Sequence, residues 1–232
     1  MQFQKINLNK ILFLDIETVP MASSFDELPE HFQELWIKKA QFLIQEDETP
    51  ESIFNRAGIY AEFGKIVCIS VGFINEKANK RELRLKSFAG DDEKQLLSNF
   101  KELITSHFDM PTHLLCAHNG KEFDFPYIAR RMLINGITVP DILDLRGKRP
   151  WEVQHLDTME LWKFGDYKHY TSLNLLAAVF EIPSPKNDID GSQVADVYYQ
   201  HKDLNRIVEY CEKDVETLIN IFLRYRGDDI FK

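Results

Sequence analysis

A short apolar run near the start of the chain, residues 11–14, is followed directly by two carboxylates. Its β-branched and aromatic residues predict a buried central strand, and Asp15 and Glu17 lie one residue apart at its end. Side chains alternate along a strand, so both carboxylates point to one face, with Cβ atoms on the order of 7 Å apart. Two anions this close repel each other unless a cation lies between them. Alternatively, this stretch is simply the polar end of a strand entering a loop.

Chain length and composition indicate a globular protein. The 232 residues suffice for one large domain or two small ones, and 44% hydrophobic with 28% charged residues exclude wholesale disorder. No apolar run approaches the roughly 18–20 residues of a membrane span. The first residues lack the pattern of a signal peptide. We therefore expect a cytoplasmic protein without a membrane partner.

Cysteine spacing and net charge argue against two further classes of protein. Cys68, Cys116 and Cys211 lie in apolar contexts without CxxC pairing, which is typical of reduced core residues and not of a disulfide or zinc framework. A net charge of −9 argues against a protein that coats duplex DNA. It does not exclude an enzyme that binds a strand end briefly, because bound divalent cations reverse the sign of the local field.

Hydrophobic periodicity and turn residues predict the order of elements along the chain. We expect a helix over about 26–45, capped by Ser23 or Ser24, and then a polar loop over 46–60 with one helical turn. Strands at 65–75 and 81–88 follow, and then a helix from Asp91 or Asp92 to Phe108. A strand at 112–117, a helix from Phe123 or Asp124 to about 135, a loop over 137–151, a short strand at 153–157 and short helices at 172–180 and 192–200 follow. The last helix spans 204–225, between Asp203 as its cap and Gly227.

This order predicts an α/β fold. A meander of three strands followed by βα units gives a mixed sheet with helices on both faces. The chain shows no internal repeat or linker, so we expect a single domain over residues 1–232, with a possible helical insertion at about 21–60.

Further acidic residues follow a strand or lie on the last helix. Asp124 ends the segment N-x3-F-D that starts at Asn119, just after the strand at 112–117. Tyr210 and Asp214 are four residues apart, so on a helix they project within about 40° of each other. Asp214 lies at the edge of the apolar stripe of that helix, where it would face the sheet.

Three motifs in this order, Asp-Ile-Glu-Thr at 15–18, N-x3-F-D at 119–124 and Y-x3-D at 210–214, resemble the DnaQ-like (DEDD) 3′–5′ exonuclease superfamily. The nearest branch is the exonuclease domain of family B DNA polymerases, which residues 62–72 and 123–128 also resemble. The chain is similar to stand-alone bacterial proteins predicted to be PolB-related exonucleases. The resemblance spans residues 11–225. It implies an RNase H-like fold with a central mixed five-stranded sheet and helices on both faces.

The resemblance also implies a two-metal site. Phosphodiester hydrolysis needs a nucleophile near neutral pH and stabilisation of charge on two oxygens, which two cations about 3.5–4 Å apart provide. Mg²⁺ or Mn²⁺ prefer carboxylates and water, as offered by a set of Asp and Glu. By resemblance, Asp15 bridges both metals, Glu17 and Asp214 complete the nucleophile-side metal, and Asp124 holds the other, directly or through water.

Tyr210 indicates the tyrosine (DEDDy) branch. The other branch carries His five positions before the last Asp, where this chain has Glu209. A phenol with a pKa near 10 is a poor general base at pH 7. We therefore expect Tyr210 to orient the attacking water.

Three residues match family positions that contact the terminal nucleotides of a single strand. These are Thr18, Asn119 and Phe123. Each has a structural alternative: Thr18 can cap a turn, Asn119 can satisfy its own Asn-Gly turn, and Phe123 can belong to the core.

Other polar and aromatic residues have structural roles by default. We expect Asp157 to be the polar end of a strand, His118 a neighbour of the turn after it, and Lys163, Lys168 and His169 a solvated loop, although the last three could contact phosphates. Trp36, Trp151 and Trp162 are expected in the core.

The leading hypothesis is a metal-dependent 3′–5′ exonuclease that releases nucleoside 5′-monophosphates from single-stranded DNA or frayed 3′ ends. An exoribonuclease with the same chemistry is the first alternative, since sugar choice depends on one or two contacts to the 2′-hydroxyl. A non-catalytic binding module is disfavoured because all four acidic residues are present. Fold analogy leaves an endonuclease open.

Overall fold

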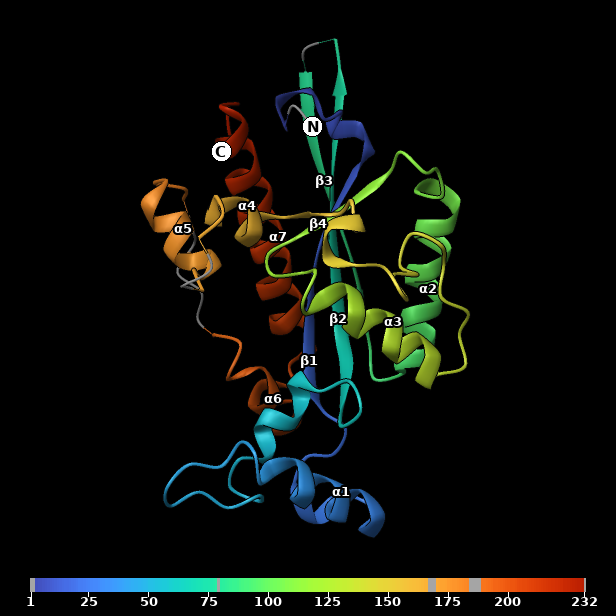
Figure 1. Ribbon diagram of the computed structural model, residues 1–232, viewed down its shortest axis with the longest axis vertical. Helices are drawn as coiled ribbons and strands as arrows, with labels where there is room; N and C mark the ends of the chain where they lie inside the picture. Colours follow the sequence, from blue (N-terminus) through green and yellow to red (C-terminus); the bar gives the residue numbers. More distant parts are fainter. Residues whose placement is uncertain (1–2, 79, 167–169, 184–188, 232) are drawn as a thin grey trace.

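The computed structural model describes residues 3–78, 80–166, 170–183 and 189–231. A five-stranded sheet in the order β3-β2-β1-β4-β5 forms its centre (Figure 1). Its strands are β1 (Ile11–Pro20), β2 (Gly64–Lys77), β3 (Lys80–Ala89), β4 (Leu114–Ala117) and β5 (Leu156–Asp157). β1, β2 and β3 are antiparallel neighbours, whereas β4 pairs in parallel with both β1 and β5. The expected mixed five-stranded sheet is confirmed.

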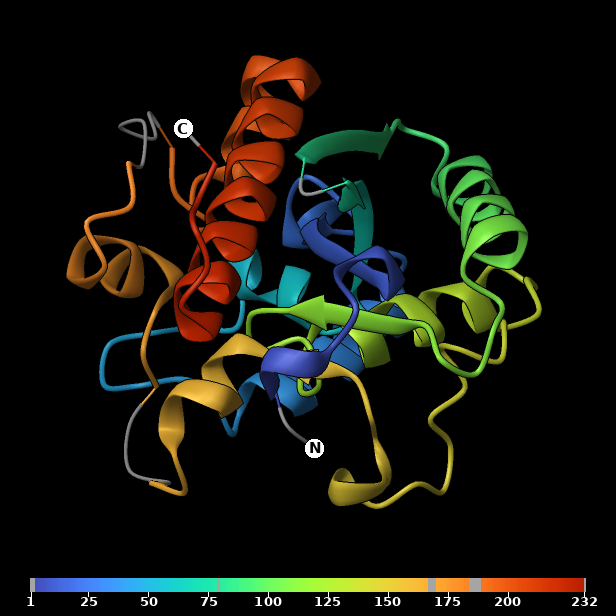
Figure 2. The ribbon, with the colours of Figure 1, turned by 90° about the horizontal axis from the view of Figure 1, so that it is seen from above.

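Helices connect and cover these strands (Figures 1 and 2). The α-helices are α1 (Glu30–Ala40), α2 (Glu93–His107), α3 (Asp124–Ile134), α4 (Thr158–Lys163), α5 (Leu173–Val179), α6 (Val194–Asp196) and α7 (Leu204–Arg226). A π-helical turn, Val197–His201, continues α6, and 3-10 turns occur at Phe3–Lys5, Leu8–Lys10, Phe25–Glu27, Phe54–Ile59 and Pro150–Glu152.

The central strand β1 is buried on both faces. Leu12, Leu14 and Ile16 belong to an apolar cluster with residues of α2 and α3. Ile11 and Phe13 belong to a second cluster with the apolar stripe of α7. In both views α7 lies on one side of the sheet, and α2 and α3 lie on the other. The alternation along β1 therefore assigns its odd-numbered residues to the face of α7.

β1 continues well beyond the end of its neighbour β4. The two strands pair only from Ile11 with Leu114 to Phe13 with Cys116, whereas β1 stays paired with β2 as far as Pro20. From Asp15 onward, the edge of β1 on the side of β4 is therefore not covered by a strand. Side chains from other elements can approach the main chain of β1 there.

The helix expected over 26–45 is shorter than predicted. Only α1 is α-helical there, preceded by the 3-10 turn Phe25–Glu27. Pro29 is the residue before the helix, with φ −54° and ψ 141°, and proline disfavours the helical conformation of the residue before it. Neither expected cap is used: Ser24 makes no cap hydrogen bond, and the hydroxyl of Ser23 donates to Glu27.

Several other predicted boundaries also move. The strand expected at 112–117 starts at Leu114, because the N–H of His113 donates to Met110 in a turn. The strand expected at 153–157 is reduced to β5, since the ring of His155 accepts the N–H of Leu115. The helix expected at 192–200 is the short α6 and the π-helical turn. By contrast, α7 agrees with the prediction, including Asp203 as its cap and Gly227 in a left-handed conformation.

One tryptophan contradicts the prediction that all three lie in the core. Trp36 is fully buried, and Trp162 packs partly buried against α7. Trp151 is 76% exposed, because the loop before β5 places it on the surface, where the guanidinium of Arg149 lies over its ring.

Residues 21–60 form a separate apolar cluster around Trp36 and Phe54, to which Phe63 just before β2 also belongs. This cluster lies at the end of β1, near α6 (Figure 1). The division of the chain into one domain with an insertion stays a prediction.

A buried ion pair ties α2 and α3 to the start of β2. Arg131 and Glu93 are 6% and 7% exposed, and two guanidinium nitrogens donate to the carboxylate. Glu93 also accepts the N–H of Ile66, and Arg131 also donates to the carbonyl of Ala61. The pair therefore fixes the helix that carries Asp124 relative to the sheet.

Removing one partner of this pair should destabilise the fold. We expect Arg131→Met to lower the free energy of unfolding by about 3–5 kcal/mol, because Glu93 is left buried without its counter-charge. Urea denaturation measures the change. Adding Glu93→Gln to Arg131→Met should recover part of the loss, and a single variant within 1 kcal/mol of the wild type would contradict the role of the pair.

Candidate active site

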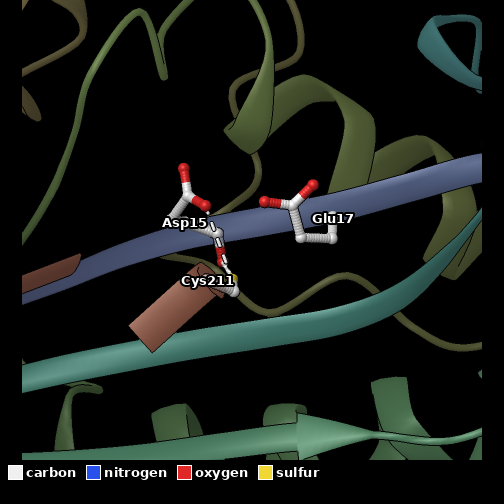
Figure 3. A group of neighbouring side chains, drawn as sticks. All are labelled: Asp15, Glu17 and Cys211. Atoms are coloured by element: carbon white, nitrogen blue, oxygen red, sulfur yellow. Dashed lines mark hydrogen bonds between the residues drawn. The ribbon is translucent and has the colours of Figure 1, made fainter. Parts of the chain in front are cut away.

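Beyond the end of β4, β1 carries two of the predicted carboxylates. Their side chains point to the face of the sheet that α7 covers. Asp15 is partly buried and Glu17 is 7% exposed. Figure 3 shows both carboxyl groups on the same side of the strand, as the alternation predicts. The carboxylates of the two residues and the thiol of Cys211 on α7 all offer an atom within 4.8 Å of one another.

Asp124 reaches the same place from α3. It is the first residue of that helix and is only 3% exposed. The main-chain N–H of Ile16 on β1 lies close enough to lower the pKa of this carboxyl group slightly, against the larger effect of burial. That N–H is accessible because β4 ends before this point of β1. The early end of β4 thus explains how an aspartate on a helix comes next to Asp15.

α7 contributes Tyr210 and Asp214. The hydroxyl of Tyr210 is hydrogen-bonded to Asp214, one helical turn further along. Besides burial, the negative charges of Glu17 and Asp15 also act on Tyr210 and raise the pKa of its hydroxyl. The structure therefore brings the five residues predicted for catalysis together from three elements. Their catalytic roles stay predictions.

Burial and mutual repulsion act on all these acids. Burial, and then the charges of Asp124 and Asp214, hold the pKa of Asp15 well above its usual range. Burial and the charge of Asp15 do the same to the pKa of Glu17. Burial raises the pKa of Asp124 from 3.8 to about 7. Burial and the neighbouring carboxylates also raise the pKa of Tyr210, so its hydroxyl stays protonated at neutral pH.

The donor set fits a hard divalent cation. Carboxylate oxygens are the ligands that Mg²⁺ and Mn²⁺ prefer, and a bound cation removes the repulsion that disfavours their ionisation. Cys211 does not change this preference, because burial raises the pKa of its thiol and only the thiolate is a strong metal ligand. The three cysteines are free and buried, as expected. The contact of Cys211 with Asp15 was not predicted, since the residue reads as part of an apolar stripe.

Asp157 organises the turn that precedes Asp124. Its carboxylate accepts the N–H groups of Asn119 and Lys121, and it also caps α4 by accepting those of Met159 and Glu160. Asp157 is therefore more than the polar end of a strand. Asn119 has φ 63° in this turn, a left-handed conformation that asparagine tolerates.

The predicted substrate contacts differ in their surroundings. Thr18 lies near the hydroxyl of Tyr127, which donates to the carbonyl of Gly58. The half-buried ring of Phe123 lies 5.3 Å from that of Tyr127 and packs against the core. The Oδ1 atom of Asn119 is buried and has no hydrogen-bond donor among the residues that the structure describes. Their contacts with a nucleotide stay predictions.

His118 and Tyr170 lie beside the acids. Nε2 of His118 donates to the carbonyl of Thr171 and Nδ1 accepts from Thr158, so both ring nitrogens are occupied. Tyr170, which the motifs did not single out, is 67% exposed and lies within electrostatic reach of Asp124, Asp15 and Asp157.

The three basic residues considered for phosphate contacts are largely untested. Lys168 and His169 lie outside the described residues. Lys163 is the last residue of α4 and is partly exposed.

Comparison with known proteins identifies the family. Residues 59–228 match the model of a family described as a predicted 3′–5′ exonuclease related to the exonuclease domain of PolB. The chain belongs to this family. The match begins after Asp15 and Glu17, so the first carboxylate pair of this exonuclease is placed by β1 and not by the family model.

A solved structure shares the fold. The exonuclease superimposes on a family B DNA polymerase from the hyperthermophilic archaeon Pyrobaculum calidifontis with a TM-score of 0.53 and 16% sequence identity. The similarity covers 93% of this chain and 24% of the polymerase chain. A search of curated proteins gave no match. None of the described helices combines the length and hydropathy that a membrane span requires.

The raised pKa of Asp124 predicts a pH-dependent stability without divalent cations. Its folded pKa of about 7 lies above the ordinary 3.8, so its protonated form stabilises the fold fully below about pH 4. This contribution is lost as the pH rises through about 7. In EDTA, the stability of wild type relative to Asp124→Asn should therefore fall by about 2–4 kcal/mol between pH 4 and pH 8.

Urea denaturation of both proteins at several pH values measures this difference. The asparagine variant carries no titrating group at the position, so the pH effects of groups far from the site cancel. The difference that remains belongs to Asp124 together with Asp15 and Glu17, whose pKa values burial raises and its charge raises further. A difference that stays constant between pH 4 and pH 8 would show that Asp124 titrates normally.

Proposed function

We propose that this protein is a metal-dependent 3′–5′ exonuclease that hydrolyses single-stranded DNA, or frayed 3′ ends, to nucleoside 5′-monophosphates. The observation that carries the proposal is the convergence of four carboxylates and Tyr210 next to the exposed edge of β1. Keeping this many buried acids together is costly unless cations bind between them.

Asp15, Glu17, Asp124 and Asp214 would hold two divalent cations, Mg²⁺ or Mn²⁺. When bound, the cations lower the pKa of water and stabilise negative charge on the attacking and leaving oxygens. The chain supplies the oxygen ligands and a partly buried setting in which these charges interact strongly. Asp15 lies at the centre of the set, since the charges of both Asp124 and Asp214 act on it.

Tyr210 would orient the attacking water. Its hydroxyl keeps its proton at neutral pH, so it acts through hydrogen bonds and not as a general base. The bond to Asp214 fixes the direction of the phenol. The hydroxyl is thereby held beside the carboxylates on which the cations would bind.

Asn119, Phe123 and Thr18 would contact the terminal nucleotides of the strand. The buried Oδ1 atom of Asn119 is an acceptor without a donor in the described part of the chain, so a hydroxyl of the strand would satisfy it. Phe123 offers a ring for stacking, which tolerates any base. DNA is favoured over RNA because the structurally similar protein is a DNA polymerase.

Two substitutions test the assignment of roles. We expect Asp15→Ala to reduce cleavage about 10³-fold or more, because the central metal ligand is lost. Tyr210→Phe should slow cleavage about 100-fold, because the water is less well oriented. Shortening of 5′-labelled single-stranded DNA with Mn²⁺ measures both rates. Wild-type rates for both variants would refute the proposal.

The choice of nucleic acid is tested separately. We expect matched single-stranded DNA to be shortened faster than RNA from an unblocked 3′ end. A 3′-phosphorothioate block should stop the reaction. Faster digestion of RNA would make the protein an exoribonuclease, and cleavage of a circular single strand would make it an endonuclease.

A further inference from the structure

Polar side chains form a row across β2 and β3 beneath α7, on the same face of the sheet as Asp15. Ser70 on β2 lies opposite Asp15, and Ser87 on β3 lies opposite Ser70. The Oγ atoms of the two serines are 2.8 Å apart, and Ser87 donates to Oε1 of Glu212 at 2.6 Å. The outer end of the row is thus a carboxylate on α7.

Two cysteines lie on the inner side of the row. Sγ of Cys68 lies 3.6 Å from Oγ of Ser70, and Cys68 is a close neighbour of Cys211 that contributes to the raised pKa of its thiol. Sγ of Cys211 lies 3.4 Å from Oδ2 and 3.5 Å from the main-chain oxygen of Asp15. Cys68, Ser70 and Cys211 are all fully buried. Buried polar groups are stable only when they are hydrogen-bonded, and here each has a partner.

The carboxylates at the two ends fix the direction of the hydrogen bonds. Glu212 accepts from Ser87, so Ser87 must accept from Ser70, and Ser70 from the thiol of Cys68. At the other end Asp15 can only accept, so Cys211 donates. Each hydrogen has one assigned acceptor, and the thiol of Cys211 is directed at Asp15.

We propose that Cys211 is a positioning residue for Asp15. The hydrogen bond from the thiol keeps Oδ2 of Asp15 directed toward Cys211. The other carboxylate oxygen points away from Cys211 (Figure 3). The inference rests on the proposed metal-dependent function.

The physical reason is the freedom of an aspartate side chain. Rotation about χ2 is only weakly restricted, so a carboxylate needs a hydrogen bond to keep one orientation. Partners that orient metal ligands commonly change metal affinity or activity about 10- to 100-fold when they are removed. A buried thiol can serve as this partner without adding a charge next to the acids.

A matched pair of substitutions tests the role. Cys211→Ala and Cys211→Ser both remove the sulfur, but only serine keeps a donor, which a shift of a few tenths of an ångström brings into reach. We expect Cys211→Ala to weaken Mn²⁺ binding about 10-fold, measured by electron paramagnetic resonance without substrate. It should lower kcat with little change in KM. Cys211→Ser should stay within about 3-fold of the wild type on both measures.

Cys116→Ala is the control for lost packing. Cys116 is as fully buried as Cys211 but lies in the cluster on β4, apart from the row. The Cys116→Ala variant should have lower thermal stability than the wild type but the same Mn²⁺ affinity. Ser70→Ala should weaken Mn²⁺ binding less than Cys211→Ala, because Ser70 hydrogen-bonds Cys68 and Ser87 and not Asp15.

The outcomes separate the inference from the proposed function. If Asp15→Ala loses Mn²⁺ while both Cys211 variants bind it like the wild type, Cys211 only packs. Equal losses in the alanine and serine variants, or in Cys116→Ala, would also overturn the positioning role. If Asp15→Ala itself binds Mn²⁺ and cleaves like the wild type, the proposed function fails first.

Discussion

Repulsion among buried carboxylates is the constraint around which this site is arranged. Burial and neighbouring charges raise the pKa values of Asp15, Glu17 and Asp124 together. Among the residues that the structure describes, no basic side chain forms an ion pair with any of these three acids. A cation is the partner that such a set lacks, and the rest of the structure serves to hold the acids in spite of their repulsion.

The fold provides this support through neutral or distant groups. Asp157 anchors the turn before Asp124 through main-chain N–H groups, and the pair of Arg131 and Glu93 fixes α3 from its other end. On the opposite side of β1, Cys211 contacts Asp15 without adding a charge. Most of the binding capacity of the acids is thereby left for a ligand.

Local sequence patterns correctly predicted those elements whose bounds are set by residues within or next to the element. The apolar stripe, cap and glycine of α7 specified its bounds, and the apolar run before Asp15 specified the central strand. Predictions failed where a distant partner decides: the ring of His155 takes the place of a strand beside Leu115, and Trp151 lies on the surface with Arg149. The helix after Pro29 is the exception, since proline was a local signal that the periodicity obscured.

The sequence by itself predicted the candidate site residues. Strand alternation puts Asp15 and Glu17 on one face, helical spacing puts Tyr210 near Asp214, and the resemblance to the exonuclease superfamily adds Asp124. It also determined the order of the elements, and hence the α/β class. Only the tertiary structure decided that β4 ends early enough for Asp124 to reach Ile16, and that Cys211 meets Asp15. Those contacts join residues up to 196 positions apart, and no local pattern encodes the packing that brings them together.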